Sequence, residues 1–174
     1  MNRLAPVVLL AGTVLTLGAC GGDDAAEVAT PGVVDVSLSD FSFGDLPEEV
    51  PAGTRFRVVN DAESELHELV AVRLPDDDRR STDEIVEAGL EKVFAAGPPT
   101  VVLLAAPRGE QIAAVGDGVL DEPGRYLVVC AIPTGADPQE YLDAAATSDG
   151  PPQVAGGPPH FTNGMYDDIT VTPG

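Results

Sequence analysis

The sequence predicts an all-β fold, a sandwich of short antiparallel strands, on two observations. Segments in which apolar and polar residues alternate recur along the chain, and this alternation turns one face of a strand to a core and the other to solvent. Turns rich in glycine and proline separate these segments, with 19 Gly and 16 Pro among 174 residues. Several short strands joined by such turns are typical of β-sandwiches.

An export signal precedes the first expected strand. Residues 1–19 contain a positive charge at Arg3, an apolar run and small residues just before Cys20, which is the layout of a secretory signal. The run is too short for an ordinary membrane span. The tetrapeptide LGAC at 17–20 resembles the bacterial lipobox, in which the chain is cut before the cysteine and that cysteine carries lipid. We therefore expect a lipoprotein signal peptide at 1–19 and an extracytoplasmic location; a plain secretory signal is the alternative.

The mature chain is expected to comprise a tether and one domain. Lipidation of Cys20 would hold the protein on the outer face of the bacterial cell membrane, in the periplasm or at the cell surface. Residues 20–32 are small, acidic and turn-forming without an apolar period, so they predict a flexible tether. Residues 33–174 then form one domain, a length that supports a sizeable core.

Five strands are expected within that domain. Each shows either alternation or an apolar run bounded by turn residues: VVDVSLSDF, TRFRVVN, LHELVAVRL, RYLVVC and DDITVTP. Residues 81–94 interrupt the series, because Ser81 and Glu84 form a capping-box pattern before apolar residues at helical spacing. This segment predicts one amphipathic helix that covers an edge or end of the sandwich. A second, short helix is expected from Asp137, a helix cap followed by proline.

The charge of the chain excludes one class of partner. Aspartate and glutamate number 29 against 9 lysines and arginines, and the acids are spread along the sequence. Such a surface repels nucleic acid and favours a basic protein or a cation. The alternative is that the charge serves solubility alone.

Four scarce side chains carry the functional information. Beyond the signal segment the chain has two histidines, His67 and His160, one methionine, Met165, and one cysteine besides Cys20, which is Cys130. An unpaired cysteine in an oxidising compartment is either a buried inert thiol or a metal ligand. Two imidazoles, a thiolate and a thioether are the ligand types of a type 1 copper site. The thioether and the lack of a second thiolate favour copper over zinc.

Three stretches resemble the cupredoxins, the plastocyanin and azurin type of blue copper protein. Residues 124–130, GRYLVVC, look like the strand that ends at the copper thiolate, and residues 160–165, HFTNGM, look like the loop that holds the second histidine and the methionine. The segment from Pro51 through Asn60 to His67 looks like the approach to the first histidine. The resemblance implies a Greek-key β-sandwich of eight strands and one copper site with the following ligands: His67, Cys130, His160 and Met165.

The chain also departs from this family. The 29 residues of 131–159 separate the cysteine from the second histidine, where the family's electron carriers have only a few. Glu68 stands where the family commonly has an asparagine that steadies the cysteine loop, so that hydrogen bond is either absent or replaced. We therefore expect Asn60 and Glu68 to help orient the ligands without binding the metal themselves. Tyr126 is expected to form the tyrosine corner of a Greek key.

The resemblance implies an electron carrier and not an enzyme. Cys130 would be the main electronic path, and His160, near the surface, the exit. The partner would be a redox or copper-exchange protein with a basic face. Copper storage or delivery is one alternative, and a metal-free interaction lipoprotein that uses loop 131–159 as its contact surface is another. Catalysis by Cys130 and His160 is disfavoured because no third member of a catalytic triad can be placed.

Overall fold

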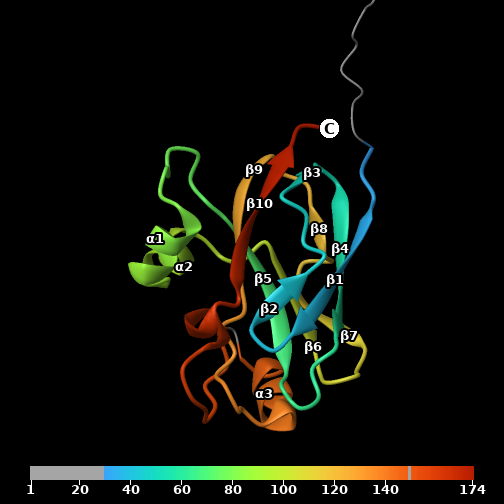
Figure 1. Cartoon of the computed structure of the whole chain (residues 1–174), viewed down its shortest axis with the longest axis vertical. Helices are drawn as coiled ribbons and strands as arrows, with labels where there is room; N and C mark the ends of the chain where they lie inside the picture. Colours follow the sequence, from blue (N-terminus) through green and yellow to red (C-terminus); the bar gives the residue numbers. More distant parts are fainter. Residues whose placement is uncertain (1–29, 149) are drawn as a thin grey trace, which may run out of the picture.

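The structure, a computed structural model, describes residues 30–148 and 150–174, which form two packed β-sheets (Figure 1). The predicted all-β sandwich is confirmed, with ten strands in the described residues where the resemblance implied eight. The signal peptide, Cys20 and all but the last three residues of the tether lie outside the described residues. The first sheet has the order β2 (Ser42–Gly44), β1 (Val33–Ser39), β4 (Thr54–Asn60) and β8 (Val119–Leu120).

The second sheet places strands that are distant in sequence side by side. Its order is β3 (Glu49–Pro51), β10 (Tyr166–Thr172), β9 (Gly124–Val129), β5 (His67–Arg73), β6 (Val101–Ala105) and β7 (Gln111–Val115). Strand β9 is antiparallel to both neighbours, and its last residue, Val129, pairs with Tyr166 and Val70. The start of β5, the end of β9 and the start of β10 therefore meet at one end of the sandwich.

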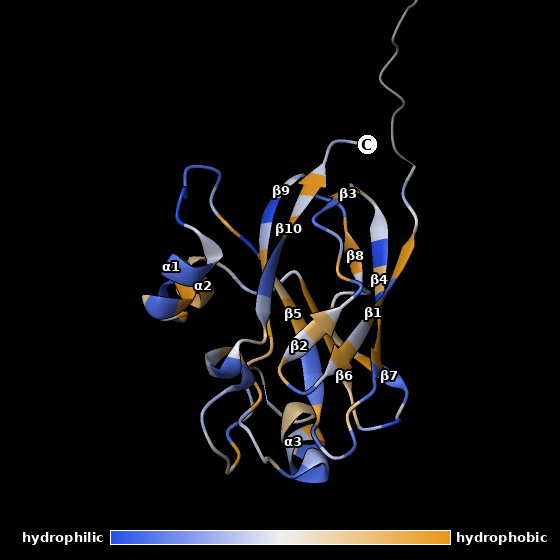
Figure 2. Ribbon diagram, in the orientation of Figure 1, coloured by the Kyte–Doolittle hydropathy of each residue, from blue (hydrophilic) through white to orange (hydrophobic). Residues whose placement is uncertain are grey.

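Alternation in the first sheet directs its apolar residues into the core. Strands β1 and β4 run parallel, with Val36 opposite Val58, and β3 and β10 are also parallel, so the prediction of a purely antiparallel sandwich is wrong at these two pairs. Along β4, Phe56 and Val58 are buried while Arg57 and Val59 are exposed, and the colours of Figure 2 change along these strands for that reason. Burial of apolar side chains at about 25 cal/mol per Å² is the main stabilising term of such a core.

The second sheet is covered on both faces at β5 and β9, which explains the unbroken apolar runs Leu69–Val72 and Tyr126–Val129 within these strands. One face contributes to the main core between the sheets. The other packs under the segment that follows β5 and forms a smaller cluster: Val70, Val72, Leu74, Ile85, Leu90, Val93, Leu127 and Val129. Strands buried on both faces read as continuous apolar runs instead of alternating ones.

The covering segment is two short helices, not the single helix predicted over 81–94. Helix α1 spans Thr82–Glu87 and α2 spans Glu91–Ala96. The expected capping box is present, because Ser81 accepts a hydrogen bond from the Glu84 N–H and the Glu84 carboxylate accepts one from the Ser81 N–H. The break falls at Gly89, whose φ of 86° lies in the left-handed region that ends a helix.

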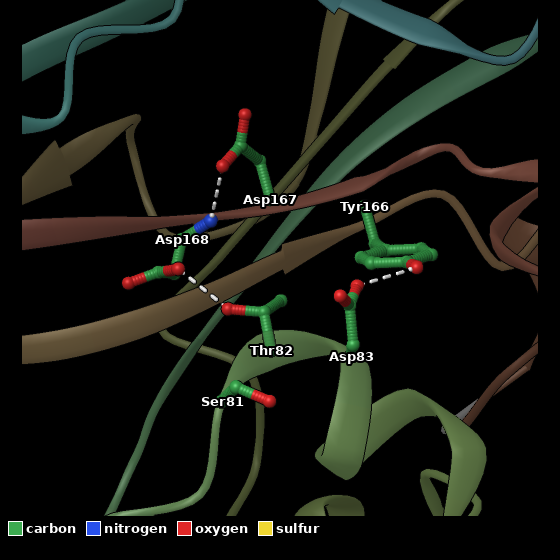
Figure 3. Close-up of a pocket in the computed structure, with 6 residues that line it drawn as sticks. All are labelled: Ser81, Thr82, Asp83, Tyr166, Asp167 and Asp168. Carbon is green, nitrogen blue, oxygen red and sulfur yellow. Dashed lines mark hydrogen bonds between the residues drawn. The ribbon is translucent and has the colours of Figure 1, made fainter.

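Polar contacts fasten α1 to the edge of β10 beside a surface pocket (Figure 3). The Tyr166 hydroxyl donates to the Asp83 carboxylate at 2.8 Å. The Thr82 hydroxyl donates to Asp168, and Arg125 pairs with the same carboxylate at 2.9 Å. The polar groups of this pocket thus hold the helical cover on the sheet.

Segment 131–159, which the structure describes except at residue 149, contains its own helix. Helix α3 (Pro138–Ala145) begins as predicted, since the Asp137 carboxylate accepts hydrogen bonds from two N–H groups of its first turn. The excursion closes at a neck, where Pro133 and Pro159 form an isolated bridge and the Thr134 N–H donates to the Pro158 carbonyl at 3.1 Å. Figure 1 shows α3 at the end of the sandwich where β5 begins.

The predicted tyrosine corner is also present. The Tyr126 hydroxyl donates to the Glu122 carbonyl at 2.8 Å, while its ring is buried in the core. Among the helices of the described residues, none is both long enough and apolar enough to span a membrane.

Candidate metal centre

Three of the four predicted ligands converge at the end of the sandwich where β5 begins. His67 is the first residue of β5, Cys130 directly follows β9, and His160 opens a 3₁₀ helix, η1 (His160–Asn163). One ligand atom from each lies within 4.8 Å of the others. The antiparallel pairing of β5 with β9 places His67 close to Cys130. The neck of loop 131–159 brings His160 back to both of them.

The contacts among these side chains are close and completely buried. The two Nδ1 atoms of His67 and His160 are 3.1 Å apart, and Cys130 Sγ lies 3.3 Å from His160 Nδ1. All three side chains have no solvent exposure. Buried nitrogen and sulfur donors that point at one another are the arrangement that a soft metal cation satisfies.

Backbone hydrogen bonds fix His160 against the cysteine strand despite the long loop. The His160 N–H donates to the Ile132 carbonyl at 3.0 Å, and the Phe161 N–H donates to the Cys130 carbonyl at 2.9 Å. Loop closure costs little extra free energy as a loop lengthens. These bonds, at the point where the excursion returns, supply the rigidity that a short loop would provide.

Met165 is adjacent to the three donors through its backbone. The Cys130 N–H donates to the Met165 carbonyl at 3.1 Å, and the Met165 N–H donates to the His160 carbonyl at 3.2 Å. Gly164, with φ of 102°, ends η1 in the left-handed conformation and turns the chain into β10. The Met165 side chain is fully buried in the core cluster that includes Cys130; its role as axial ligand stays a prediction.

Burial keeps the donors neutral when no metal is bound. Desolvation, aided by the charge of Glu68, raises the pKa of the Cys130 thiol far above its usual range. Desolvation lowers the pKa of both His67 and His160. Neutral imidazoles are ready to bind a metal, whereas the thiol must release its proton to the solvent as the cation enters.

Glu68 supports the cysteine loop. Its carboxylate accepts a hydrogen bond from the Ala131 N–H at 3.1 Å and lies 3.5 Å from the Tyr141 hydroxyl of α3. Its own N–H donates to Cys130 Sγ at 3.4 Å. The bond expected from an asparagine is thus replaced by one from Glu68, whose pKa burial raises to about 7.

Asn60 shapes the approach to His67. Its amide donates to the carbonyls of Glu65 and Ala105 at 2.9 and 2.7 Å, and its carbonyl accepts from the Ala62 N–H. These bonds are all to backbone groups, so Asn60 fixes the turn between β4 and β5 and the end of β6. It positions His67 from a distance.

The prediction that His160 lies near the surface is wrong. Its side chain is fully buried, and the ring edge of Phe41 packs against it with centroids 5.3 Å apart. Two further neighbours were not predicted: Asp40 beside His67 and Glu65 beside His160, with N–O distances of 3.5 and 3.4 Å. Nothing marks these two carboxylates among 29 acids in the sequence.

Comparisons with known proteins give a likeness to solved auracyanin structures at low identity. No protein-family model matches the chain, and no curated protein matches it. Among solved structures, the chain is similar to a reduced auracyanin from the photosynthetic bacterium Roseiflexus castenholzii, at 17% identity and a TM-score of 0.45, over 83% of this chain and 99% of that one. It is also similar to auracyanin B, at 20% identity and a TM-score of 0.37, over 83% and 91% of the two chains. Auracyanin A, a "blue" copper protein from the green thermophilic photosynthetic bacterium Chloroflexus aurantiacus, shares 16% identity at a TM-score of 0.43, over 82% of this chain and 100% of that one.

Proposed function

We propose that this chain binds one type 1 copper ion and transfers electrons. His67, Cys130 and His160 would form the trigonal ligand set, and Met165 would be the weak axial ligand. The observation that carries the proposal is the convergence of two Nδ1 atoms and one Sγ in a fully buried cluster. Copper, when bound there, supplies the one-electron chemistry.

The composition of the cluster favours copper among the metals. Imidazole suits both oxidation states of copper, and a thiolate stabilises the reduced one. Structural zinc sites hold four strong ligands, commonly with more than one thiolate. Among the His, Cys, Asp and Glu side chains of the described residues, this cluster contains only one sulfur and two nitrogens.

The rigidity of the site supports electron transfer over storage or delivery. Each ligand is anchored by a strand or by backbone hydrogen bonds, so the donors keep their places when the oxidation state changes. Neither histidine is exposed, which opposes ready handover of the metal. Phe41, which is half-buried and contacts His160, offers a path for electrons toward the surface.

The setting of the protein is part of the proposal. An N-terminal lipid on Cys20 would hold the chain on the outer face of the bacterial membrane, and a short tether raises its local concentration at membrane partners. The net charge of −20 favours a redox partner with a basic face.

A copper titration of the purified chain tests this function. One equivalent of Cu(II) should produce an intense visible band from charge transfer between the thiolate and copper, and Cys130→Ser should abolish it. Reversible voltammetry would support electron transfer, and irreversible reduction would favour delivery. Absence of copper uptake would overturn both and leave a metal-free interaction protein.

A further inference from the structure

We propose that Glu65 and Asp40 are positioning residues for the two histidine ligands, and that their charges set the reduction potential of the site. This inference rests on the proposed copper function. It concerns the outward side of each imidazole, where a buried nitrogen faces a carboxylate.

The outward nitrogens of both ligand rings are buried without a hydrogen bond. Because the Nδ1 atoms of His67 and His160 face each other, each Nε2 points away from the cluster. Neither Nε2 is exposed to solvent, and neither has a hydrogen-bond partner within the described residues. An unpaired buried N–H costs about 1–3 kcal/mol, so a partner for each is expected.

Glu65 is placed to serve His160. Its Oε2 lies 3.4 Å from His160 Nε2, a few tenths of an ångström beyond a good hydrogen bond. The Gly135 N–H donates to the same carboxylate, at 3.1 Å from Oε2. Glu65 therefore links the turn before β5 to the start of loop 131–159, and it lies beside His160 at the end of this loop.

Asp40 is placed in the same way for His67. Its Oδ1 lies 3.5 Å from His67 Nε2. Together with Phe41 it forms the turn between β1 and β2, where Phe41 has a left-handed φ of 61°. This one turn thus supplies a carboxylate to the first histidine and an aromatic edge to the second.

A carboxylate behind a metal-bound imidazole has two effects. It holds the proton on Nε2, which leaves Nδ1 free for the metal, and it raises the basicity of the ligand. Its negative charge also stabilises Cu(II) more than Cu(I), which lowers the potential. Glu65 should act more strongly than Asp40, because their side chains are 19% and 62% exposed and water screens the second.

Neutral, nearly isosteric variants measure these effects. In Glu65→Gln we expect copper to bind with the affinity of Cu(II) reduced about tenfold relative to Cu(I), which raises the potential by about 59 mV for one electron. Asp40→Asn should shift it in the same direction by less. Glu63→Gln is the control, because Glu63 is an exposed residue of the same turn and its change removes the same charge.

A second readout separates positioning from general electrostatics. In the chain loaded with Cu(I), which is diamagnetic, nitrogen-15 NMR should show a protonated Nε2 on both histidines, and Glu65→Gln should move the His160 resonance alone. Copper binding with an unchanged potential and unchanged histidine resonances in Glu65→Gln would overturn this inference. An equal shift of the reduction potential in Glu63→Gln would also overturn the inference. Loss of the copper site in the unmodified chain would instead refute the proposed function.

Discussion

At the level of single residues, burial keeps the side chains of the candidate metal centre neutral in the absence of metal. Cys130, Glu68, His67 and His160 lie together in the interior, and desolvation shifts the pKa of each toward its uncharged form. Separate buried charges are costly, whereas a cation beside a thiolate compensates both. The site is therefore set up to exchange a proton for a metal ion.

Glu68 should make the metal-free protein less stable as the pH rises. Its pKa is about 7 in the folded chain against a reference value of 4.5, so the folded state holds a proton that the unfolded state loses first. The stabilisation is complete below pH 4.5 and is lost as pH rises through 7, amounting to about 3 kcal/mol.

Urea unfolding in the presence of a chelator measures this effect against Glu68→Gln. The comparison is needed because the two buried histidines also change the free energy of unfolding. Their lowered pKa values make the folded chain less stable as the pH falls below 6.5, which is opposite to the effect of Glu68. Subtracting the variant from the unmodified chain cancels the histidines. A difference in unfolding free energy that stays constant between pH 5 and 8 would contradict the assignment of Glu68.

At the level of elements, the neck of loop 131–159 decides where His160 lies. A methyl group on Gly156 would lie 2.5 Å from the Pro133 side chain, so Gly156→Ala must spread the neck. We expect a loss of about 1–3 kcal/mol of stability and weaker copper binding. Gly150→Ala is the matched control in the same loop, because nothing lies within 4 Å of its added carbon. Equal copper affinity in the two variants would show that the neck does not position His160.

Sequence patterns predicted the elements where a single local rule decides the structure. Alternation predicted β1 and β4, and the capping box predicted the start of α1. The end of that helix was misplaced because the apolar period continues across Gly89, while the left-handed backbone of this glycine breaks the helix.

The candidate site, too, could be predicted only in part from the sequence. The ligand types are scarce, so their identity and order predicted His67, Cys130 and His160 as a cluster. The burial of His160 could not be predicted, because it depends on Phe41 from a turn in the other sheet. The same holds for Glu65 and Asp40, which only the tertiary fold distinguishes from the other acids.

At the level of the whole molecule, the net charge of −20 governs encounters with partners. Reduction of the copper-loaded chain by a cationic reagent should be fast at low ionic strength and slow down as salt is added, since screening shortens the range of attraction to about 10 Å at 0.1 M. An anionic reagent should show the opposite trend. Stopped-flow kinetics with both reagents make the comparison, and rates independent of salt would argue against electrostatic steering.

The central claim is that one copper ion is held jointly by Cys130, His67 and His160. X-ray absorption at the copper edge of the loaded chain measures the ligand atoms directly. We predict one short copper–sulfur distance and two copper–nitrogen distances, with the sulfur lost in Cys130→Ser. A first shell of nitrogen and oxygen alone in the unmodified chain would contradict the claim.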